Sequence, residues 1–515
     1  MEAIDFLDRG AYLGADRHCF VAGERTWTYE QSRRLTMRIA SALTRDGFRI
    51  GTHVALLSPN DPVAFMCALG AVRAHMVWVP LNPRNSVEDI VDQLDAFDCE
   101  VLFYHSSYES IAAAARARLP AVRRMVCVDA AVGATPVLEQ WLDGASDQFS
   151  IAPADPHDVM MIMTTGGTTG RPKGVMQTHL AFESMVASRL VSRPTDHPPR
   201  FLAAAQLTHG GGLACFPIFA RGGTVYVLPA AKPELIMDAI ARYRITELTL
   251  PVAAVYMLLA HPDVRKHDYS SIEYFNYATA PMSETKLREA LDVFGPVMIQ
   301  GWGQSEALAL TFLSKEDHVT ANDGSNGKRL LSCGQQLPFA EVAVMDLEGR
   351  LLSSGEIGEF VARSNTVMKG YYKDPEATAE AFRFGWHHTG DMGYCDEDGY
   401  FYIVDRSKDM IISGGFNVFP SEIERVLWSH PAVQDCAVIG VPDEKWGERI
   451  TAIVELKAGM SVAAEELLAA CKTRLGSVKA PKVVEFWAEL PRSPIGKVLK
   501  REIREKFWAG AARKV

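Results

Sequence analysis

The sequence has few of the features that mark secreted, metal-binding or membrane-spanning proteins. Its nine cysteines, in 515 residues, include no Cys-x-x-Cys pair, which argues against a zinc site or a disulfide framework and favours reduced thiols. The first residues are acidic and lack the basic segment that opens a signal peptide. Arg73 and His75 interrupt the best apolar stretch, so no run is long enough to span a bilayer. We therefore expect a cytoplasmic protein without an integral membrane segment.

The chain also lacks an excess of basic residues. Its formal net charge is −10, which argues against general affinity for nucleic acid. A hydrophobic content of 48% with 23% charged residues is ordinary for a globular protein. The length allows several hydrophobic cores and therefore more than one domain.

Apolar runs of strand length alternate with helical patterns through the N-terminal part of the chain. The strand candidates are 53–57, 77–80, 101–104, 125–128, 159–163, 201–205, 224–228, 247–251, 274–278 and 297–300. The helix candidates between them include 61–76, 86–97, 233–243 and 284–294. Repeated β–α units predict mostly parallel sheets covered by helices, and two series of them predict two packed α/β subdomains.

The pattern changes after about residue 330, where shorter alternating runs such as 340–345 and 358–362 predict a small β-rich subdomain. Another unit begins near Ser407, and the Ser-x-x-Glu spacing of Ser421–Glu424 predicts a capping box. The fold class is therefore α/β. We expect an N-terminal domain of residues 1–406, with the two sheets and the β-rich subdomain, and a small α+β C-terminal domain of residues 407–515.

A glycine- and threonine-rich segment, Thr164–Gly174, follows the apolar run 159–163, and a helical pattern opens at Thr178. Glycines let the backbone approach a ligand closely, and threonine hydroxyls add donors to the exposed amides, so the segment suits phosphate oxygens. It differs from the common nucleotide loop, because Lys173 is followed by glycine rather than by serine or threonine. The alternative is a mobile connection without a ligand.

A second segment, Gly301–Glu306, follows a strand candidate directly. Open α/β sheets place ligands at the carboxyl ends of their parallel strands. There Trp302 could cover a nucleobase, Ser305 could bond a phosphate, and Glu306 could hold Mg²⁺. The alternative is an ordinary turn with a packed tryptophan.

Three later segments have weaker signals when each is taken alone. Thr389–Asp391 and Asp405–Asp409 offer a carboxylate for ribose hydroxyls and a nearby arginine. Ser413–Val418 is glycine-rich, and Pro491–Lys500 contains a turn that would present Lys497 in a defined place. Each also has an ordinary structural explanation.

In this order, the five segments resemble the adenylate-forming superfamily, which includes acyl- and aryl-CoA synthetases, peptide-synthetase adenylation domains and luciferases. The resemblance extends over nearly the whole chain. It implies that ATP activates a carboxylate to an acyl-adenylate and pyrophosphate, and that a thiol, usually that of coenzyme A, then takes the acyl group. It also implies Mg²⁺, and a C-terminal domain that rotates between the two half-reactions.

The resemblance assigns residue roles by motif position. The phosphates are held by Thr165, Gly166, Gly167, Thr168, Thr169, Gly170 and Lys173, and Mg²⁺ by Glu306 and Thr165. The rest of the nucleotide and acyl-phosphate site comprises Thr279, Ala280, Pro281, Gln300, Gly301, Trp302, Gly303 and Ser305. Asp391 and Arg406 match the ribose ligands. Lys497 matches the catalytic lysine that bridges the carboxylate and the α-phosphate, and Lys408 matches the hinge.

The acceptor site is assigned by the same resemblance. Its expected members, around the pantetheine and the phosphates of coenzyme A, are Gly414, Gly415, Trp446, Lys479 and Lys482. An acyl-AMP ligase that serves a carrier protein is the alternative. The sequence has no carrier-type Gly-x-Asp-Ser motif, and the short run between Asp391 and Arg406 leaves little sign of the insertion that such ligases carry.

The acid-binding wall is expected to be apolar. Its candidate residues are Phe182, Met185, His209, Gly210, Gly211, Val252, Tyr277, Gly303 and Leu308. His209 follows a threonine, which departs from the aromatic-histidine pattern of the superfamily, and the three glycines after it would leave room for a large acyl group. No aspartate among these positions could hold a substrate ammonium, so we expect a fatty, cyclic or aryl acid.

These inferences favour an ATP-dependent acid:CoA ligase whose partners are a small carboxylic acid, ATP and CoA. A nucleotide-binding regulator on an inactive enzyme scaffold would be a protein of a different class. Lys173, Glu306, Asp391 and Lys497 all stand at their motif positions, which argues against it. Luciferase-like oxidation has no specific support, and a homodimer stays open.

Overall fold

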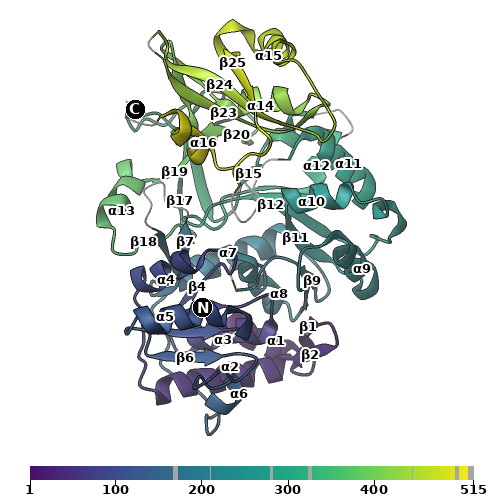
Figure 1. The fold of residues 1–515 in the computed structure, drawn as a ribbon. Coiled ribbons are helices and arrows are strands. Elements are labelled where there is room, and N and C mark those ends of the chain that lie inside the picture. The colour runs from purple at the N-terminus through teal and green to yellow at the C-terminus, as the bar shows by residue number, and fades with distance from the viewer. Residues whose placement is uncertain are drawn as a thin grey trace. The chain divides into compact units, whose positions relative to one another are not determined.

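The computed structural model describes residues 1–165, 172–208, 210–278, 282–322, 327–443, 445–492 and 498–508. They form two compact units (Figure 1). The first unit combines Met1–Val342 with Ala362–His387, and the second combines Ala343–Val361 with His388–Val515. The domain boundary expected at 406/407 falls inside the second unit and stays a prediction.

The first unit contains a seven-stranded sheet whose inner strands are parallel. Its order is β18 (Gly370–Tyr371), β8 (Lys173–Thr178), β7 (Val159–Thr165), β4 (Val77–Pro80), β3 (His53–Leu57), β5 (Cys99–Tyr104), β6 (Arg124–Cys127). Strands β7, β4, β3, β5 and β6 pair in parallel, whereas β8 and β18 continue the edge in antiparallel pairing. The hairpin of β7 and β8 brackets the glycine-rich segment.

A nine-stranded sheet completes the first unit. Its order is β15 (Gln335–Gln336), β14 (Thr311–Leu313), β13 (Met298–Trp302), β12 (Tyr274–Ala278), β11 (Glu247–Pro251), β9 (Arg200–Ala203), β10 (Thr224–Val227), β1 (His18–Ala22), β2 (Arg25–Thr28). From β13 to β1 every pairing is parallel. The predicted fold class, with mostly parallel sheets covered by helices, is confirmed.

Helices bury the apolar faces of both sheets. The core between the sheets takes side chains from α2 (Tyr29–Arg45), α3 (Pro62–Arg73), α7 (His179–Ser192) and α8 (Phe216–Ala220). Helices α4 (Val87–Ala96) and α5 (Glu109–Arg118) cover the other face of the seven-stranded sheet. Helices α9 (Pro233–Tyr243), α10 (Val252–Leu259) and α11 (Glu284–Phe294) cover β11 and β12 (Figure 1). Among the described residues, none of the helices has both the length and the apolar character that a membrane crossing requires.

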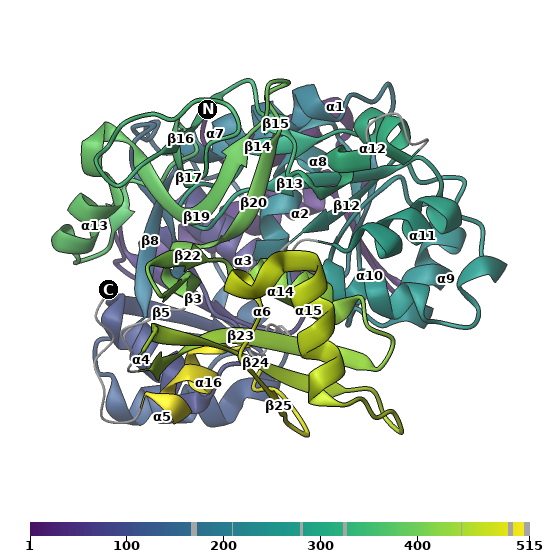
Figure 2. The ribbon, with the colours of Figure 1, turned by 90° about the horizontal axis from the view of Figure 1, so that it is seen from above.

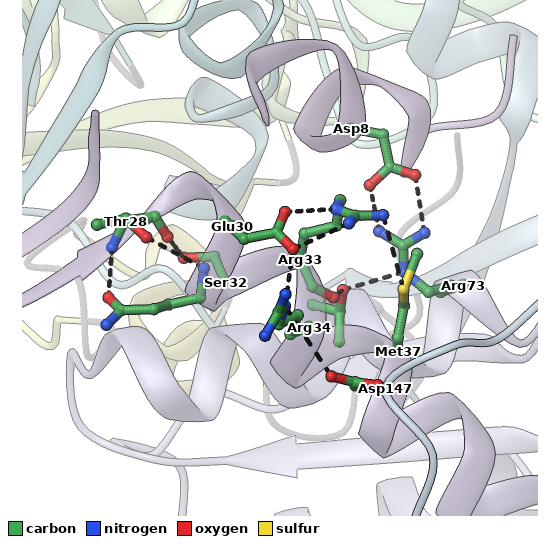
Figure 3. Close-up of polar contacts among 11 residues, drawn as sticks. Asp8, Thr28, Glu30, Ser32, Arg33, Arg34, Met37, Arg73 and Asp147 are labelled. Atoms are coloured by element: carbon green, nitrogen blue, oxygen red, sulfur yellow. Dashed lines mark hydrogen bonds and ion pairs between the residues drawn. The ribbon is translucent and has the colours of Figure 1, made fainter. Parts of the chain in front are cut away.

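Arg73, which interrupts the apolar run of α3, is buried and paired. Its guanidinium donates to both carboxylate oxygens of Asp8, at 2.5 and 2.8 Å (Figure 3). It also donates to Thr36 Oγ1 at 3.0 Å. Asp8 lies on α1 (Asp5–Gly14), so the pair ties α1 to α3. A buried charge is tolerated when it is paired and hydrogen-bonded in this way.

The second unit holds most of a sheet of β16 (Ala340–Met345), β17 (Gly358–Ser364), β19 (His387–Cys395) and β20 (Phe401–Arg406). Beyond it, a sheet orders β22 (Phe416–Val418), β21 (Ile411–Ser413), β24 (Gly447–Leu456) and β23 (Val433–Asp443), with β25 (Val483–Phe486) beside β24. Helices α14 (Pro420–Trp428) and α15 (Ala464–Lys479) cover one face of this sheet, and α16 (Lys500–Phe507) covers the other (Figure 2).

The capping box predicted at Ser421 is wrong. Helix α14 begins at Pro420 and has no side-chain cap, so Ser421 lies within its first turn. The Ser421 amide donates to Asp405 Oδ2 at 2.8 Å, and its hydroxyl donates to the carbonyl of Val404. The amide and the hydroxyl of Ser421 are therefore bonded to residues of β20 and not to the first turn of α14.

Candidate nucleotide and acid site

Lys173 and Glu306 meet at a tyrosine that the sequence analysis did not identify. The Tyr371 hydroxyl donates to Glu306 Oε1 at 3.0 Å, and Lys173 Nζ lies 4.9 Å from the centre of the Tyr371 ring. Pairing of Tyr371 with Val175 in β8 fixes this arrangement. Burial, followed by the charge of Glu306, raises the pKa of Tyr371, so its hydroxyl stays a donor. The only sequence signal for Tyr371 is its place in a Gly-Tyr-Tyr run.

The turn after β13 is anchored from β8. Gln177, which is fully buried, donates from Nε2 to the carbonyl of Ser305 at 2.6 Å. The amide of Met368 donates to the carbonyl of Glu306 at 2.7 Å. Trp302 is buried at the end of β13, opposite Thr311. Backbone bonds therefore hold the Ser305–Glu306 segment and leave the Glu306 carboxylate to Tyr371 and to a ligand.

Asp391 and Arg406, the predicted ribose ligands, are neighbours in the second unit. They are register partners in the antiparallel pair β19–β20, and Arg406 Nε lies 2.6 Å from Asp391 Oδ1. The backbone amide of Asp391 donates to Thr389 Oγ1 at 3.1 Å. Strand pairing therefore brings together two residues that are fifteen positions apart in the sequence.

Most of the expected CoA residues gather at Trp446. Gly414 has a φ of +59°, and a Cβ there would lie 2.8 Å from the Trp446 ring, so glycine is required. Lys482 Nζ lies 5.8 Å from the ring centre, and Lys445 Nζ, which the sequence analysis did not identify, lies 4.8 Å from it. Gly415 follows with a φ of +83°. Lys479 instead pairs with Glu422 at 2.7 Å.

The expected hinge residue is held by the last helix. Lys408 lies in a short 3₁₀ turn, Ser407–Asp409, directly after β20. Arg504 of α16 donates to the carbonyl of Lys408 at 3.0 Å and to Asp409 Oδ1 at 2.8 Å. The segment predicted to change conformation is therefore bonded through one side chain to α16.

The acid-wall candidates are divided between two cores. Phe182 and Met185 lie in the core between the sheets, with Leu308 packed against it. Val252 and Tyr277 lie in the core under α9–α11. The lining roles of all five stay predictions.

Two of the three glycines after His209, Gly211 and Gly212, do not open the space that we expected. A Cβ on Gly211 would lie 2.5 Å from the carbonyl oxygen of Gln206, and a Cβ on Gly212 would lie 2.7 Å from the ring of Phe65. Protein atoms therefore fill the volume beside both of these glycines. Glycine is needed at these positions because the backbone lies too close to neighbouring atoms to leave room for a side chain.

Tyr277 of β12 belongs to a largely buried polar group with Gln300 of β13 and His318. Its hydroxyl oxygen lies 3.2 Å from the side-chain amide of Gln300 and 3.0 Å from His318 Nε2. His318, on α12 (Lys315–Asn322), is fully buried, and its Nδ1 lies 2.6 Å from the carbonyl of Ser314. Burial lowers the pKa of His318 to about 4. No motif in the sequence pointed to His318.

Several predicted site residues lie outside the described residues: Gly166, Gly167, Thr168, Thr169, Gly170, His209, Thr279, Ala280, Pro281 and Lys497. Their roles stay predictions, as does that of the Thr165 side chain. Within the described residues, no group of three or more His, Cys, Asp or Glu side chains could hold a metal. A single carboxylate, Glu306, fits Mg²⁺, because Mg²⁺ is commonly held by one or two carboxylates together with substrate phosphates.

Known proteins are similar to this chain in sequence and in fold. The family model described as AMP-binding enzyme matches residues 7–372, and the model of the AMP-binding enzyme C-terminal domain matches residues 422–497. The chain is 38% identical to a feruloyl-CoA synthase of an Amycolatopsis species, over 94% of this chain and 95% of that protein. It is 41% identical to the medium/long-chain fatty-acid–CoA ligase FadD8 of Mycobacterium tuberculosis, over 70% of this chain and 63% of that protein.

Among solved structures, the amide bond synthetase McbA from Marinactinospora thermotolerans superimposes with a TM-score of 0.88 at 30% identity, over 98% of this chain and 100% of McbA. The chain belongs to the AMP-binding enzyme family of the adenylate-forming superfamily. Within that superfamily it is an acyl-CoA synthetase.

Proposed function

We propose that the protein joins a hydrophobic carboxylic acid to coenzyme A through an acyl-adenylate, with release of AMP and pyrophosphate. The observation that carries this proposal is the meeting of Lys173 and Glu306 at Tyr371. A cation and a carboxylate at the edge of a parallel sheet, beside a glycine-rich segment, suit a magnesium-bound polyphosphate.

The first half-reaction brings a carboxylate against a polyanion, so its barrier is partly electrostatic repulsion. Mg²⁺, when bound at Glu306, would neutralise phosphate charge. Lys173 and the amides of the glycine-rich segment would hold the β- and γ-phosphates. Lys497 would balance charge between the acid and the α-phosphate as it develops in the transition state. Asp391 would accept the ribose hydroxyls, with Arg406 keeping its carboxylate oriented.

A hydrophobic acid is consistent with the apolar residues that are predicted to line the acid-binding wall. Phe182 and Met185 are fully buried and apolar, and a fatty-acid ligase and a feruloyl-CoA synthase are among the relatives. Because Gly211 and Gly212 leave no free volume beside them, the size of the acyl group must be set elsewhere in the wall.

Coenzyme A is the proposed acceptor because two lysine side chains lie near one partly exposed aromatic ring. Trp446 is 38% exposed, with Lys445 and Lys482 near its ring. A flat, half-exposed indole suits stacking on an adenine base, and lysines suit phosphates.

A panel of carboxylic acids tests the proposal. Ferulate, octanoate and palmitate are each supplied with ATP, and pyrophosphate release is measured with and without CoA. We expect acid-dependent release and a CoA thioester with at least one acid. Acyl-adenylate formation without thioester formation would favour the carrier-protein alternative. Absence of acid-dependent release with every acid would contradict the proposed function.

A further inference from the structure

The Tyr277 hydroxyl lies between two side chains, Gln300 and His318. If both presented an acceptor atom to it, the single hydroxyl hydrogen could satisfy only one of them. Tyr277 and Gln300 are register partners in the parallel pair β12–β13. The Tyr277 hydroxyl lies 3.2 Å from the position of Gln300 Oε1 and 3.0 Å from His318 Nε2. A hydroxyl has one hydrogen and can donate to one acceptor only. Tyr277 and His318 are almost fully buried, so water does not reach them to donate a hydrogen bond to the second acceptor, and an unsatisfied buried acceptor would be destabilising.

The backbone decides which nitrogen of His318 carries the hydrogen. Nδ1 lies 2.6 Å from the carbonyl oxygen of Ser314, and a carbonyl only accepts, so Nδ1 must donate. Burial keeps the ring neutral above about pH 4 by lowering the pKa of His318. The ring therefore has a single hydrogen, and Nε2 presents a lone pair to Tyr277.

The direction of the remaining bonds follows. The Tyr277 hydroxyl donates to His318 Nε2, which leaves its oxygen as an acceptor toward Gln300. The amide group of Gln300 that faces Tyr277 is then its NH₂ group, since the two amide atoms of a glutamine are distinguished by their partners. The carbonyl oxygen of Gln300 consequently points away from Tyr277.

We propose that His318 and Tyr277 are positioning residues, which turn the Gln300 carbonyl toward the bound nucleotide so that it selects a purine with an amino group at position 6. A carbonyl oxygen accepts a hydrogen bond from that amino group and repels the oxo group of hypoxanthine. This inference rests on the proposed function and on the predicted place of Gln300 in the nucleotide site. It adds two residues that act on the nucleotide through Gln300 and not by direct contact with the purine.

Comparison of ATP with ITP tests the inference, because the two nucleotides differ only at purine position 6 and the adjoining N1 hydrogen. Dissociation constants are measured by calorimetry, together with kcat/KM for pyrophosphate release. We expect the wild type to prefer ATP. In Tyr277→Phe the amide loses its acceptor and can turn its NH₂ group to the oxo group, so the ATP:ITP ratio should narrow by about tenfold, the equivalent of one hydrogen bond.

Tyr269→Phe is the matched control. Tyr269 is buried in the same core, and its hydroxyl donates to the carbonyl of Val264 at 2.7 Å. This variant also loses one buried hydroxyl, and its ATP:ITP ratio should stay at the wild-type value. An equal change in both variants, or an unchanged ratio in Tyr277→Phe, would overturn the inference. If Tyr277→Phe does not fold, His318→Leu is measured in its place. Leucine cannot accept a hydrogen bond, so the Tyr277 hydroxyl would donate to the Gln300 carbonyl instead, and the same narrowing of the ATP:ITP ratio is expected.

The tautomer of His318 provides a second readout that needs no activity. In protein with ¹⁵N-labelled histidine, we expect His318 to show a protonated Nδ1 and an unprotonated Nε2 at neutral pH. A protonated Nε2 would overturn the inference. A wild type that binds ATP over ITP but releases no pyrophosphate with any acid would instead contradict the proposed function alone.

Discussion

The guanidinium of Arg406 lies 2.6 Å from the carboxylate of Asp391, across a register pair of β19 and β20. The Asp391 side chain is 4% exposed, whereas that of Arg406 is 42% exposed. A buried carboxylate is stable only when it is paired and hydrogen-bonded, so Arg406 accounts for the burial of Asp391. The pair presents a fixed acceptor of the kind that ribose hydroxyls require.

Asp391→Asn should remove the enzyme's ability to distinguish ATP from 2′-deoxy-ATP. An ionised carboxylate is a stronger hydrogen-bond acceptor than an amide, and a bond to a charged group contributes about 1.5–3 kcal/mol. We expect kcat/KM for ATP to fall by roughly tenfold to a hundredfold, with a much smaller change for the deoxynucleotide. Initial rates of pyrophosphate release with both nucleotides measure this.

Asp396→Asn is the control for that experiment. Asp396 is a carboxylate in the turn between the same two strands, β19 and β20, and it accepts a hydrogen bond from the Tyr402 hydroxyl at 3.0 Å. Its substitution should leave the ratio of the two nucleotides unchanged. Equal discrimination by wild type and Asp391→Asn would remove Asp391 from the ribose site.

Tyr371→Phe should slow adenylation by about tenfold, the equivalent of roughly one hydrogen bond. The Tyr371 hydroxyl orients the Glu306 carboxylate, which is the predicted Mg²⁺ ligand. We therefore also expect a higher Mg²⁺ concentration for half-maximal rate. Titration of Mg²⁺ in the pyrophosphate assay checks both effects. Tyr372→Phe is the control, because the Tyr372 hydroxyl bonds Asp98 at 2.5 Å; a matching effect there would show that the Glu306 contact is not the cause.

Lys497→Ala should impair one half-reaction only. Removal of a charged donor from a transition state costs roughly 10²–10³ in rate, so adenylation should fall by that factor. Thioester formation from supplied acyl-adenylate should largely survive. Single-turnover measurements of the two steps check this, with Lys472→Ala, an exposed lysine of α15, as the control. Equal loss in both steps would contradict the division of labour.

The buried His318 should make the first unit sensitive to acid. Its pKa is lowered by burial from 6.5 to about 4, against the opposing effects of the Ser314 carbonyl and the Asp317 charge. Between these two values the unfolded chain binds more protons than the folded one, so the free energy of unfolding falls as pH drops from 6.5 toward 4. A shift of this size corresponds to about 3 kcal/mol. Above pH 6.5 this contribution does not change.

His318→Gln removes the titrating group and keeps a polar side chain. The fall in its unfolding free energy between pH 7 and pH 4.5 should be smaller than that of the wild type by about 2–3 kcal/mol. Denaturant unfolding followed at several pH values measures the difference. Parallel pH profiles of the two proteins would show that His318 is not the group that titrates.

Regular elements with strong local periodicity could be predicted from the sequence. Strands β11 and β12 and helices α9 and α11 have the predicted bounds. The spacing of their apolar residues indicates the type of element, and the extent of the pattern indicates its length. Strand β8 could not be predicted in this way. Its six residues begin with Lys173 and Gly174, and they form a strand because β7 and β18 pair with them on either side.

The superfamily was determined by the sequence alone, because the order and spacing of five motifs along the chain identify it without any coordinates. The tertiary structure alone decided the neighbours of those motifs. Tyr371 reaches Glu306 from 65 residues away, and His318 reaches Tyr277 from 41 residues away. Such partners depend on which strands pair and on which carbonyl faces which ring nitrogen, and no local pattern of residues encodes either.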